Sequence, residues 1–185
     1  MQFLSDFADQ AVILPLVLAT ALALWLGGWA RGAIAWLLVC GVTLATVGVA
    51  KLAVFTLGPF PAIPLLLSPS GHTASAALVY GGLIGLLFTG TRPRHLVVIA
   101  AALAGVLGLT RMALGLHTLP DTLVGAAIGL AGAAILELTA GHRPDRFHRL
   151  LPIGFAAAVL LGFHGLRMPA EPWLRVFAAT LAPSR

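Results

Sequence analysis

Six long apolar segments dominate the chain, and short polar stretches separate them. A helix needs about 20 apolar residues to cross the hydrocarbon core of a membrane, and each segment is close to that length. The pattern therefore predicts an all-α fold, a bundle of six transmembrane helices. We expect the helices at residues 11–29, 32–57, 72–89, 95–116, 120–140 and 150–166.

The stretch after the sixth segment has a different character. Residues 168–185 contain three prolines, and they combine apolar side chains such as Trp173 and Phe177 with a charged one, Arg175. This stretch is too short and too interrupted to span a bilayer, so it is predicted to form a helix lying in the membrane interface.

Composition supports the membrane interpretation. Of the 185 residues, 59% are hydrophobic and only 9% are charged, whereas soluble domains carry about 25% charged residues. The length suits one integral-membrane domain over residues 1–185. The net charge of +5 does not indicate nucleic-acid binding, because the chain has no run of Lys or Arg. Membrane lipids are the expected surroundings, and the oligomeric state is left open.

Basic residues in the short loops predict the orientation. In a six-helix zigzag, three loops on one side carry arginines, and that side should face the cytoplasm. The opposite side receives the acidic N-terminus, the loop 58–70 and the turn 116–120. Arg167, Arg175 and Arg185 also fall on that outer side and oppose the trend, but the short loops frame most of the spans. Their arginines are Arg31, Arg92, Arg94, Arg143, Arg146 and Arg149.

Polar residues inside the apolar sequence converge on the outer side. Ionisable groups are costly in a membrane, and they usually mark a functional site. Four predicted helices place such residues near the same membrane face. They are Lys51, Ser70, Gly71, His72, Arg111, His117 and Asp121.

These residue types suit the binding and transfer of a phosphate group. Lys51 and Arg111 can neutralise phosphate oxygens. Ser70 offers a hydroxyl, and the amide of Gly71 can approach an anion closely. The sequence has no Asp/Glu cluster that would hold magnesium, so we expect neither a metal nor another cofactor.

The remaining three residues suit covalent catalysis. His117 can act as a nucleophile through one ring nitrogen, and Asp121 can orient the ring through the other. His72 can protonate a leaving oxygen and later activate water.

Each residue also has an ordinary structural explanation. A lone Lys51 near a helix end usually extends its amine to the interface, Ser70 can simply cap a helix, and Asp121 can stabilise a helix N-terminus. These explanations predict no common face and no particular spacing, and the combined pattern therefore favours a site. His95, His142 and His148 lie on the other predicted side and receive no chemical role.

Two sequence motifs resemble those of the type 2 phosphatidic acid phosphatase (PAP2) family, which belongs to the lipid phosphatase and vanadium haloperoxidase superfamily. The segment Pro69–His72 is an intact Pro-Ser-Gly-His motif. Thr110-Arg111, followed by His117 and Asp121, has the spacing of the family's Ser-Arg…His…Asp motif, with Thr in place of Ser. The motif region extends over residues 51–121.

A third motif is only partly present. The family pattern is Lys, six residues, then Arg-Pro; here Lys51 and Pro59 match, but Gly58 stands at the arginine position. A missing guanidinium removes a contact worth about 1.5–3 kcal/mol. We hypothesise that Arg167 or Arg175, on the same predicted face, compensates for it.

The resemblance implies specific roles and a class of substrate. His117 would form a phosphohistidine with Asp121 as its partner, and His72 would be the general acid. Lys51, Ser70, Gly71 and Arg111 would bind the phosphate. Bacterial relatives of this size hydrolyse lipid phosphates or pyrophosphates, undecaprenyl pyrophosphate among them, at the outer face of the inner membrane.

Two alternatives stay open at this level. A phosphotransferase would pass the same phosphoryl group to a lipid or sugar acceptor instead of water. A non-catalytic lipid-phosphate binder or transporter would have kept the fold after losing the arginine at position 58. The sequence does not name the lipid.

Overall fold

Helices form at nearly every position where the apolar pattern predicts them. The structure is a computed structural model, and it describes residues 1–58, 61–63, 65–88 and 93–181. The predicted residues Pro59, Arg92 and Arg185 lie outside this part, as does the side chain of Arg94. The helices are α1 (Gln2–Asp6), α2 (Gln10–Leu26), α3 (Ala30–Leu57), α4 (Gly71–Ser75), the π-helix η1 (Ala76–Tyr80), α5 (Gly81–Leu87), α6 (Pro93–Ala113), α7 (Leu119–Ala140), α8 (Leu150–Phe163) and α9 (Ala170–Leu181).

Several boundaries differ from the expected ones, and α2 and α8 each end three residues early, at Leu26 and Phe163. The third apolar segment is continuous from 71 to 87 but contains η1, which the apolar pattern does not distinguish from an α-helix. The fourth helix ends at Ala113, three residues early, because the chain turns through Gly115 at φ 67°. The short α1 was not expected, since five residues show no measurable periodicity.

Length and composition indicate which helices can cross a membrane. In the part of the chain that the structure describes, three are long and apolar enough by these criteria, namely α3, residues His95–Ala113 of α6, and α7. The remaining apolar helices, α2, Gly71–Leu87 and α8, are shorter. Large apolar side chains such as Val42, Leu109 and Leu138 are exposed on the bundle surface. These features suggest an integral membrane protein, and six spanning helices remain a prediction.

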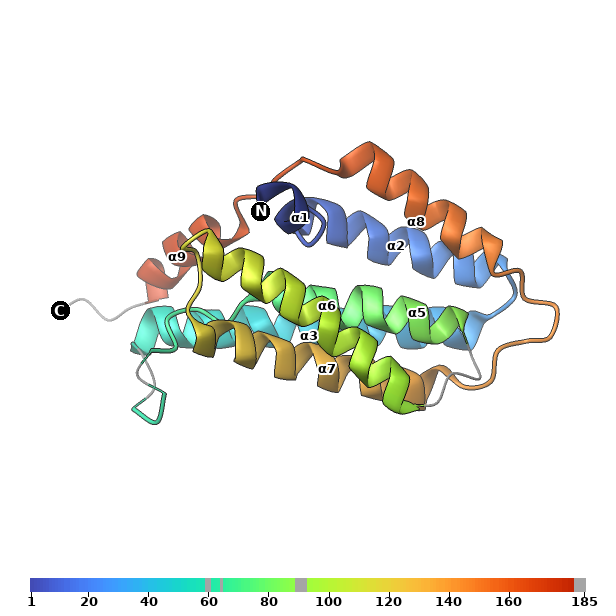
Figure 1. Cartoon of the computed structure of the whole chain (residues 1–185), viewed down its shortest axis with the longest axis horizontal. Helices are drawn as coiled ribbons and strands as arrows, with labels where there is room; N and C mark the ends of the chain where they lie inside the picture. The colour runs from blue at the N-terminus through green and yellow to red at the C-terminus, as the bar shows by residue number, and fades with distance from the viewer. Residues whose placement is uncertain (59–60, 64, 89–92, 182–185) are drawn as a thin grey trace.

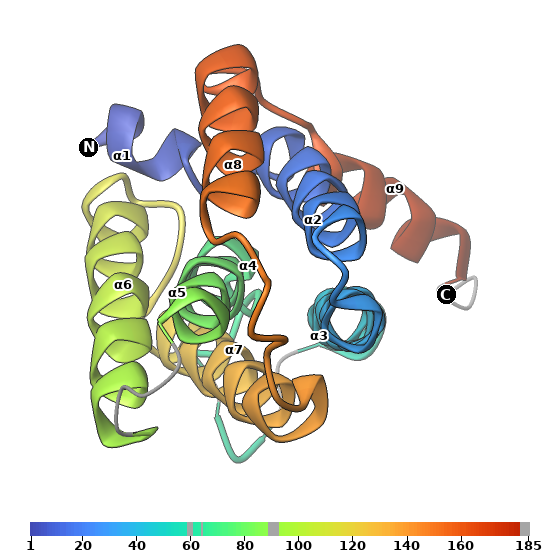
Figure 2. The same ribbon diagram turned by 90° about the vertical axis from the view of Figure 1, so that its right-hand side faces the viewer.

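The segment α4–η1 lies at the centre of the bundle. Helix α2 packs against α8 and α3, α3 packs against α7, and α6 and α7 enclose α4 and η1 (Figures 1 and 2). All residues from Thr73 to Val79 are buried. The central position of this segment means that its N-terminal residues, Gly71 and His72, are held by several helices at once.

Two glycines allow α7 to approach α4 closely. A Cβ atom at Gly125 would collide with the carbonyl oxygen of Ser70, and one at Gly129 would collide with that of Ala74. Small residues commonly serve this purpose where helices pack in membranes. The approach fixes α4 against the helix that begins beside Asp121, so it sets the relative position of two of the predicted motifs.

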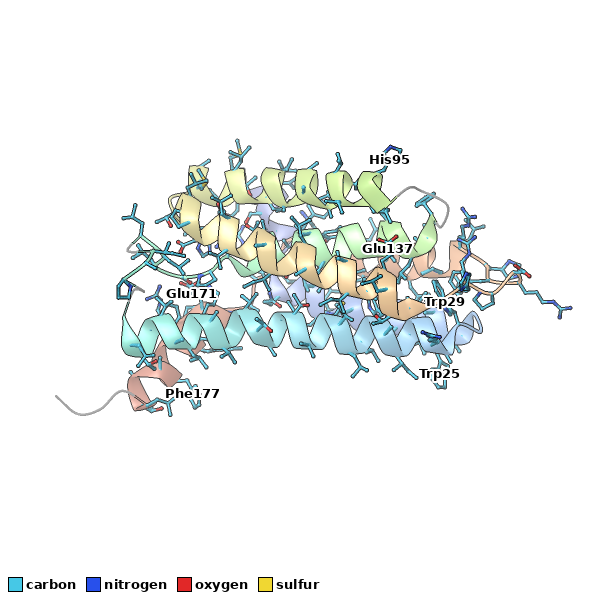
Figure 3. The ribbon with its side chains drawn as sticks, turned by 90° about the horizontal axis from the view of Figure 1, so that it is seen from below. Trp25, Trp29, His95, Glu137, Glu171 and Phe177 are labelled. Carbon is cyan, nitrogen blue, oxygen red and sulfur yellow. The ribbon has the colours of Figure 1, made fainter. Side chains whose placement is uncertain are left out.

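The two ends of the bundle differ in the segments that they gather. At one end lie α1, α9, the start of α4 and the α6–α7 turn, while the α2–α3 turn and the α7–α8 loop lie at the other (Figure 1). Glu171 and Phe177 mark the first end, and Trp25 and Trp29 mark the second (Figure 3). The predicted functional residues therefore share one end, whereas Arg143, Arg146 and Arg149 belong to a loop at the opposite end.

Candidate active site

A cavity of about 610 Å³ opens at the end of the bundle that holds α1 and α9. Segments distant in the sequence line it together. Most predicted site residues are among the lining, but Ser70 and Asp121 are not, because both are buried behind it. The predicted residues that line the cavity are Lys51, Gly71, His72, Arg111, His117, Arg167 and Arg175.

His117 and Asp121 are held in register by the start of α7. Thr118 is the N-cap of this helix; its hydroxyl accepts a hydrogen bond from the Asp121 amide, and its own amide donates to Oδ2 of Asp121 at 2.9 Å. This reciprocal capping box fixes the carboxylate. The same Oδ2 lies 3.5 Å from Nδ1 of His117. That pair is longer than a hydrogen bond, and no other described residue bonds to Nδ1.

Asp121 also joins α7 to the loop before α4. Its Oδ1 accepts hydrogen bonds from the amides of Leu67 and Ser68, at 2.9 and 2.8 Å, and its backbone carbonyl accepts one from the amide of Ser70. The residue as a whole is 1% exposed. One buried carboxylate therefore holds the loop that precedes one motif and lies beside the histidine of another.

The surroundings of His117 favour its neutral form. Burial lowers the pKa of the imidazole, and the positive charges of Lys51 and Arg111 lower it further, while Glu171 and Asp121 act in the opposite direction. An unprotonated ring nitrogen is the form that can attack phosphorus. Because Nδ1 is the nitrogen nearer to Asp121, Nε2 is the nitrogen predicted to act as the nucleophile.

Lys51 is a buried cation with two partners. Its residue is 7% exposed, and its Nζ donates to Oγ of Ser68 at 2.6 Å and to Oε2 of Glu171 at 2.8 Å. Its burial and its two partners show that the amine does not simply extend into water. The ordinary explanation for an interfacial lysine therefore does not account for Lys51.

The Ser-Gly turn has a clear structural task. Ser70 is the N-cap of α4, and its hydroxyl accepts hydrogen bonds from the amide and the hydroxyl of Thr73. Ser70 itself is fully buried, so the structural explanation holds for its side chain. Gly71, the next residue, reaches the cavity wall. Phosphate binding by Ser70 remains a prediction.

Arg111 extends from α6 to the cavity, and only part of its guanidinium is hydrogen-bonded. Its Nη1 donates to Oγ of Ser5 in α1 at 3.0 Å, and its buried Nε has no partner among the described residues. A buried donor without a partner is costly. This guanidinium consequently retains hydrogen-bonding capacity that an anion in the cavity could use.

The two arginines proposed to compensate for Gly58 are each paired with a carboxylate. Arg167 binds both oxygens of Asp6, at 3.0 and 3.2 Å, and its charge and hydrogen bond lower the pKa of that carboxyl. Arg175 binds Oε1 of Glu171 at 2.8 Å and lies over the ring of Phe55. Both line the cavity, and their compensating role remains a prediction.

The backbone explains why residue 58 is a glycine. Gly58 ends α3 with φ 87° and ψ 177°, a combination that is essentially restricted to glycine. Arginine at this position would require a different exit from the helix. The departure from the family motif therefore agrees with the backbone conformation of residue 58.

Acidic residues around the cavity were missed by the sequence analysis. Asp6, Asp9 and Glu171 belong to terminal segments that no motif includes, yet with Asp121 they make four of the six acidic residues in the chain. The signal was the small number of carboxylates. Each carboxylate is costly to place in an apolar membrane protein, so each can be expected to pair with one of the arginines on the outer side. Within the described ranges, no group of three His, Cys, Asp or Glu residues could hold a metal ion.

Comparisons with known proteins agree with the motif analysis. Residues 55–145 match the model of the PAP2 superfamily. The chain therefore contains a PAP2 superfamily domain over these residues. It is also 27% identical over 191 residues to an uncharacterized 22.5 kDa protein in the cps region of Klebsiella pneumoniae, covering 98% of this chain and 91% of that protein. No solved structure matches.

Proposed function

We propose that the protein is a membrane lipid phosphatase that acts through a phosphohistidine. The observation that carries the proposal is the single cavity into which four separate segments bring two imidazoles and two cations: His72, His117, Lys51 and Arg111. Membership of the PAP2 superfamily supports a phosphate substrate. The relative from Klebsiella adds no activity, because its name states none.

The chemistry needs two displacements at phosphorus. Nε2 of His117 attacks the phosphorus, and the bond from phosphorus to the leaving oxygen breaks as His72 gives that oxygen a proton. His72, now neutral, accepts a proton from water, whose oxygen attacks the phosphohistidine. The N–P bond breaks, inorganic phosphate forms, and both histidines return to their starting states. Asp121 stabilises the positive charge that develops on His117.

A lipid tail can be accommodated beside this polar site. Leu14, Leu44, Val47 and Leu174 form an apolar part of the cavity wall, contributed by α2, α3 and α9. We propose that six helices cross the inner membrane and that the cavity faces the periplasm or exterior, as the arginine-rich loop at the opposite end favours. The substrate is then a lipid phosphate or pyrophosphate within reach of the outer leaflet.

The test is phosphate release from a panel of lipid phosphates and pyrophosphates that includes undecaprenyl pyrophosphate. Wild-type protein should release inorganic phosphate, His117→Ala should not, and orthovanadate should inhibit. Transfer to an acceptor alcohol without phosphate release would identify a phosphotransferase. Binding of vanadate without turnover on any substrate would identify a non-catalytic binder, and either result would reject the phosphatase.

A further inference from the structure

Lys51, the most buried cation of the cavity, is already paired with a carboxylate, that of Glu171. Oε2 of Glu171 lies 2.8 Å from Nζ of Lys51, and Oε1 lies 2.8 Å from Nη2 of Arg175. Glu171 comes from α9, far along the chain from Lys51 in α3, and both residues line the cavity. An anion of this protein therefore already holds the group that the proposed function assigns to the substrate phosphate.

We propose that Glu171 is a resident competitor for the phosphate-binding site, which binds Lys51 when the cavity is empty and returns to displace inorganic phosphate after hydrolysis. The inference rests on the proposed function, in which Lys51 binds the phosphate. It adds a residue that controls how tightly substrate and product are held.

The chemistry of the two ligands makes them exchangeable. Carboxylate and phosphate oxygens both accept short, charge-assisted hydrogen bonds from an ammonium group. A buried ammonium without an anionic partner is costly, so Lys51 needs Glu171 whenever phosphate is absent. Ser68 remains hydrogen-bonded to Lys51 at 2.6 Å and can stay so during the exchange.

The second cation assigned to the phosphate, Arg111, is paired with no carboxylate among the described residues. Arg111 is hydrogen-bonded to the neutral hydroxyl of Ser5, and its Nε has no partner in the described part of the chain. An incoming phosphate can thus first engage Arg111 and then replace Glu171 on Lys51. Of the two cations that the proposed function assigns to the phosphate, Lys51 is the one paired with Glu171.

Glu171 is suited to leave and to return. Burial alone would raise the pKa of its carboxyl, but the charge and hydrogen bond of Lys51 and the hydrogen bond of Arg175 outweigh burial and lower it to about 2. The group is therefore an anion at neutral pH. Arg175 can keep one carboxylate oxygen while the other leaves Lys51. Helix α9 lies at the margin of the bundle, packed against α3 (Figure 2).

The experiment compares Glu171→Gln with wild type and with Glu137→Gln. Glutamine preserves the size of the side chain and a hydrogen-bond acceptor for Lys51 but removes the competing charge. Glu137 is the only other glutamate in the chain; it belongs to α7 and lies far from Glu171 along the bundle, so its substitution is a matched control (Figure 3). The probes are inorganic phosphate and orthovanadate, bound to purified protein in lipid nanodiscs.

We expect the Kd of Glu171→Gln for phosphate to fall about tenfold, equivalent to about 1.4 kcal/mol, and product inhibition by phosphate to strengthen by the same factor. Glu137→Gln should match wild type. Unchanged or weaker phosphate binding by Glu171→Gln would overturn the inference. Should the glutamine variant not fold, Glu171→Asp, whose shorter side chain reaches Lys51 less well, should also bind phosphate more tightly than wild type, and equal binding would overturn the inference.

Binding and turnover separate this inference from the proposed function. Tighter phosphate binding by Glu171→Gln supports the competitor whatever the identity of the lipid substrate. Full turnover by His117→Ala would reject the proposed mechanism. It would not alter the comparison of phosphate affinity between wild type and Glu171→Gln. Turnover that depends on His117, with equal phosphate affinity in wild type and Glu171→Gln, would retain the phosphatase and reject the competitor.

Discussion

Oδ2 of Asp9 lies 3.9 Å from Nε2 of His72, at the junction of the two ends of the chain. Asp9 is the N-cap of α2, and its Oδ1 accepts hydrogen bonds from the amides of Ala11 at 2.9 Å and Met168 at 2.8 Å. The carboxylate is therefore fixed by both terminal segments. It can hold the imidazole of the proposed general acid in position.

Asp9→Asn should lower kcat by about tenfold, as expected for weakening part of a general-acid contribution of about 10²–10⁴, while KM changes little. Asparagine is as good an N-cap as aspartate, so α2 should remain intact. Steady-state kinetics beside a thermal unfolding curve would check this. A large loss of thermal stability with normal kcat would show that Asp9 only supports the fold.

Asp121→Asn should affect activity and stability together. One amide oxygen can still accept the hydrogen bonds of Leu67 and Ser68, but the NH₂ group would then face the amide of Thr118 and Nδ1 of His117. Losing a buried, charge-assisted hydrogen bond costs about 1.5–3 kcal/mol, and losing the orienting carboxylate should reduce kcat by about 10²-fold or more. Phosphate release and denaturant unfolding measure the two effects separately. An active, equally stable variant would remove Asp121 from the mechanism.

The acid side of the pH–rate profile should report His117. Its pKa is lowered, chiefly by burial and then by the charges of Lys51 and Arg111, so kcat/KM should stay level as the pH falls through the ordinary histidine value of about 6.5 and decline only below it. The free energy of unfolding should also decrease toward acid pH. The contribution of neutral His117 is present above pH about 6.5 and is lost as the pH falls toward its folded-state pKa.

Glu171 provides a control for that profile. Its negative charge raises the pKa of His117, so Glu171→Gln should move the acid limb of kcat/KM to lower pH. The pH dependence of kcat/KM on one lipid phosphate, wild type beside variant, measures the shift. A limb that moves to higher pH would contradict the electrostatic description of the site.

Restoring the family arginine at position 58 should not restore a stronger site. The backbone of Gly58 has φ 87° and ψ 177°, and a side chain in that region costs about 1–3 kcal/mol. Gly58→Arg should therefore lower the free energy of unfolding by about this amount, measured by denaturant titration. Gly154→Ala, at a helical glycine with open space around it, is the control and should change stability little. Higher activity in Gly58→Arg without loss of stability would show that the loop adapts.

Much of the fold was predictable because apolar length alone selects helices in this chain. The expected boundaries near 57 and 140 agree with the ends of α3 and α7, and the predicted interfacial segment contains α9. The π-helix η1 could not be predicted, because its residues are as apolar as those of the neighbouring turns. Whether six helices span the membrane stays a prediction, since α8 has only 14 residues.

The motif residues of the site were identifiable because their spacing is specific, but their partners were not. His117 and Asp121 are four residues apart on the same chain segment, so local geometry brings them together. Lys51 meets Glu171 across 120 positions, and His72 meets Asp9 through the packing of α4 against other helices. Such long-range pairs depend on the tertiary arrangement, which no periodicity in the sequence records.

The approach of α7 to α4 yields the last prediction. A Cβ at Gly129 would meet the backbone of Ala74 and the side chain of Ala77, so Gly129→Leu should separate α7 from α4 and displace Asp121 relative to His72. Overpacking of this kind typically costs about 1–3 kcal/mol. The rate of phosphate release should fall by more than the loss of folded protein alone would cause, because the two motifs lie on α4 and α7, which the substitution separates. Gly105→Leu in α6, where the surrounding space is open, is the control and should retain both properties; equal losses in the two variants would show that helix propensity, rather than the α4–α7 contact, determines the result.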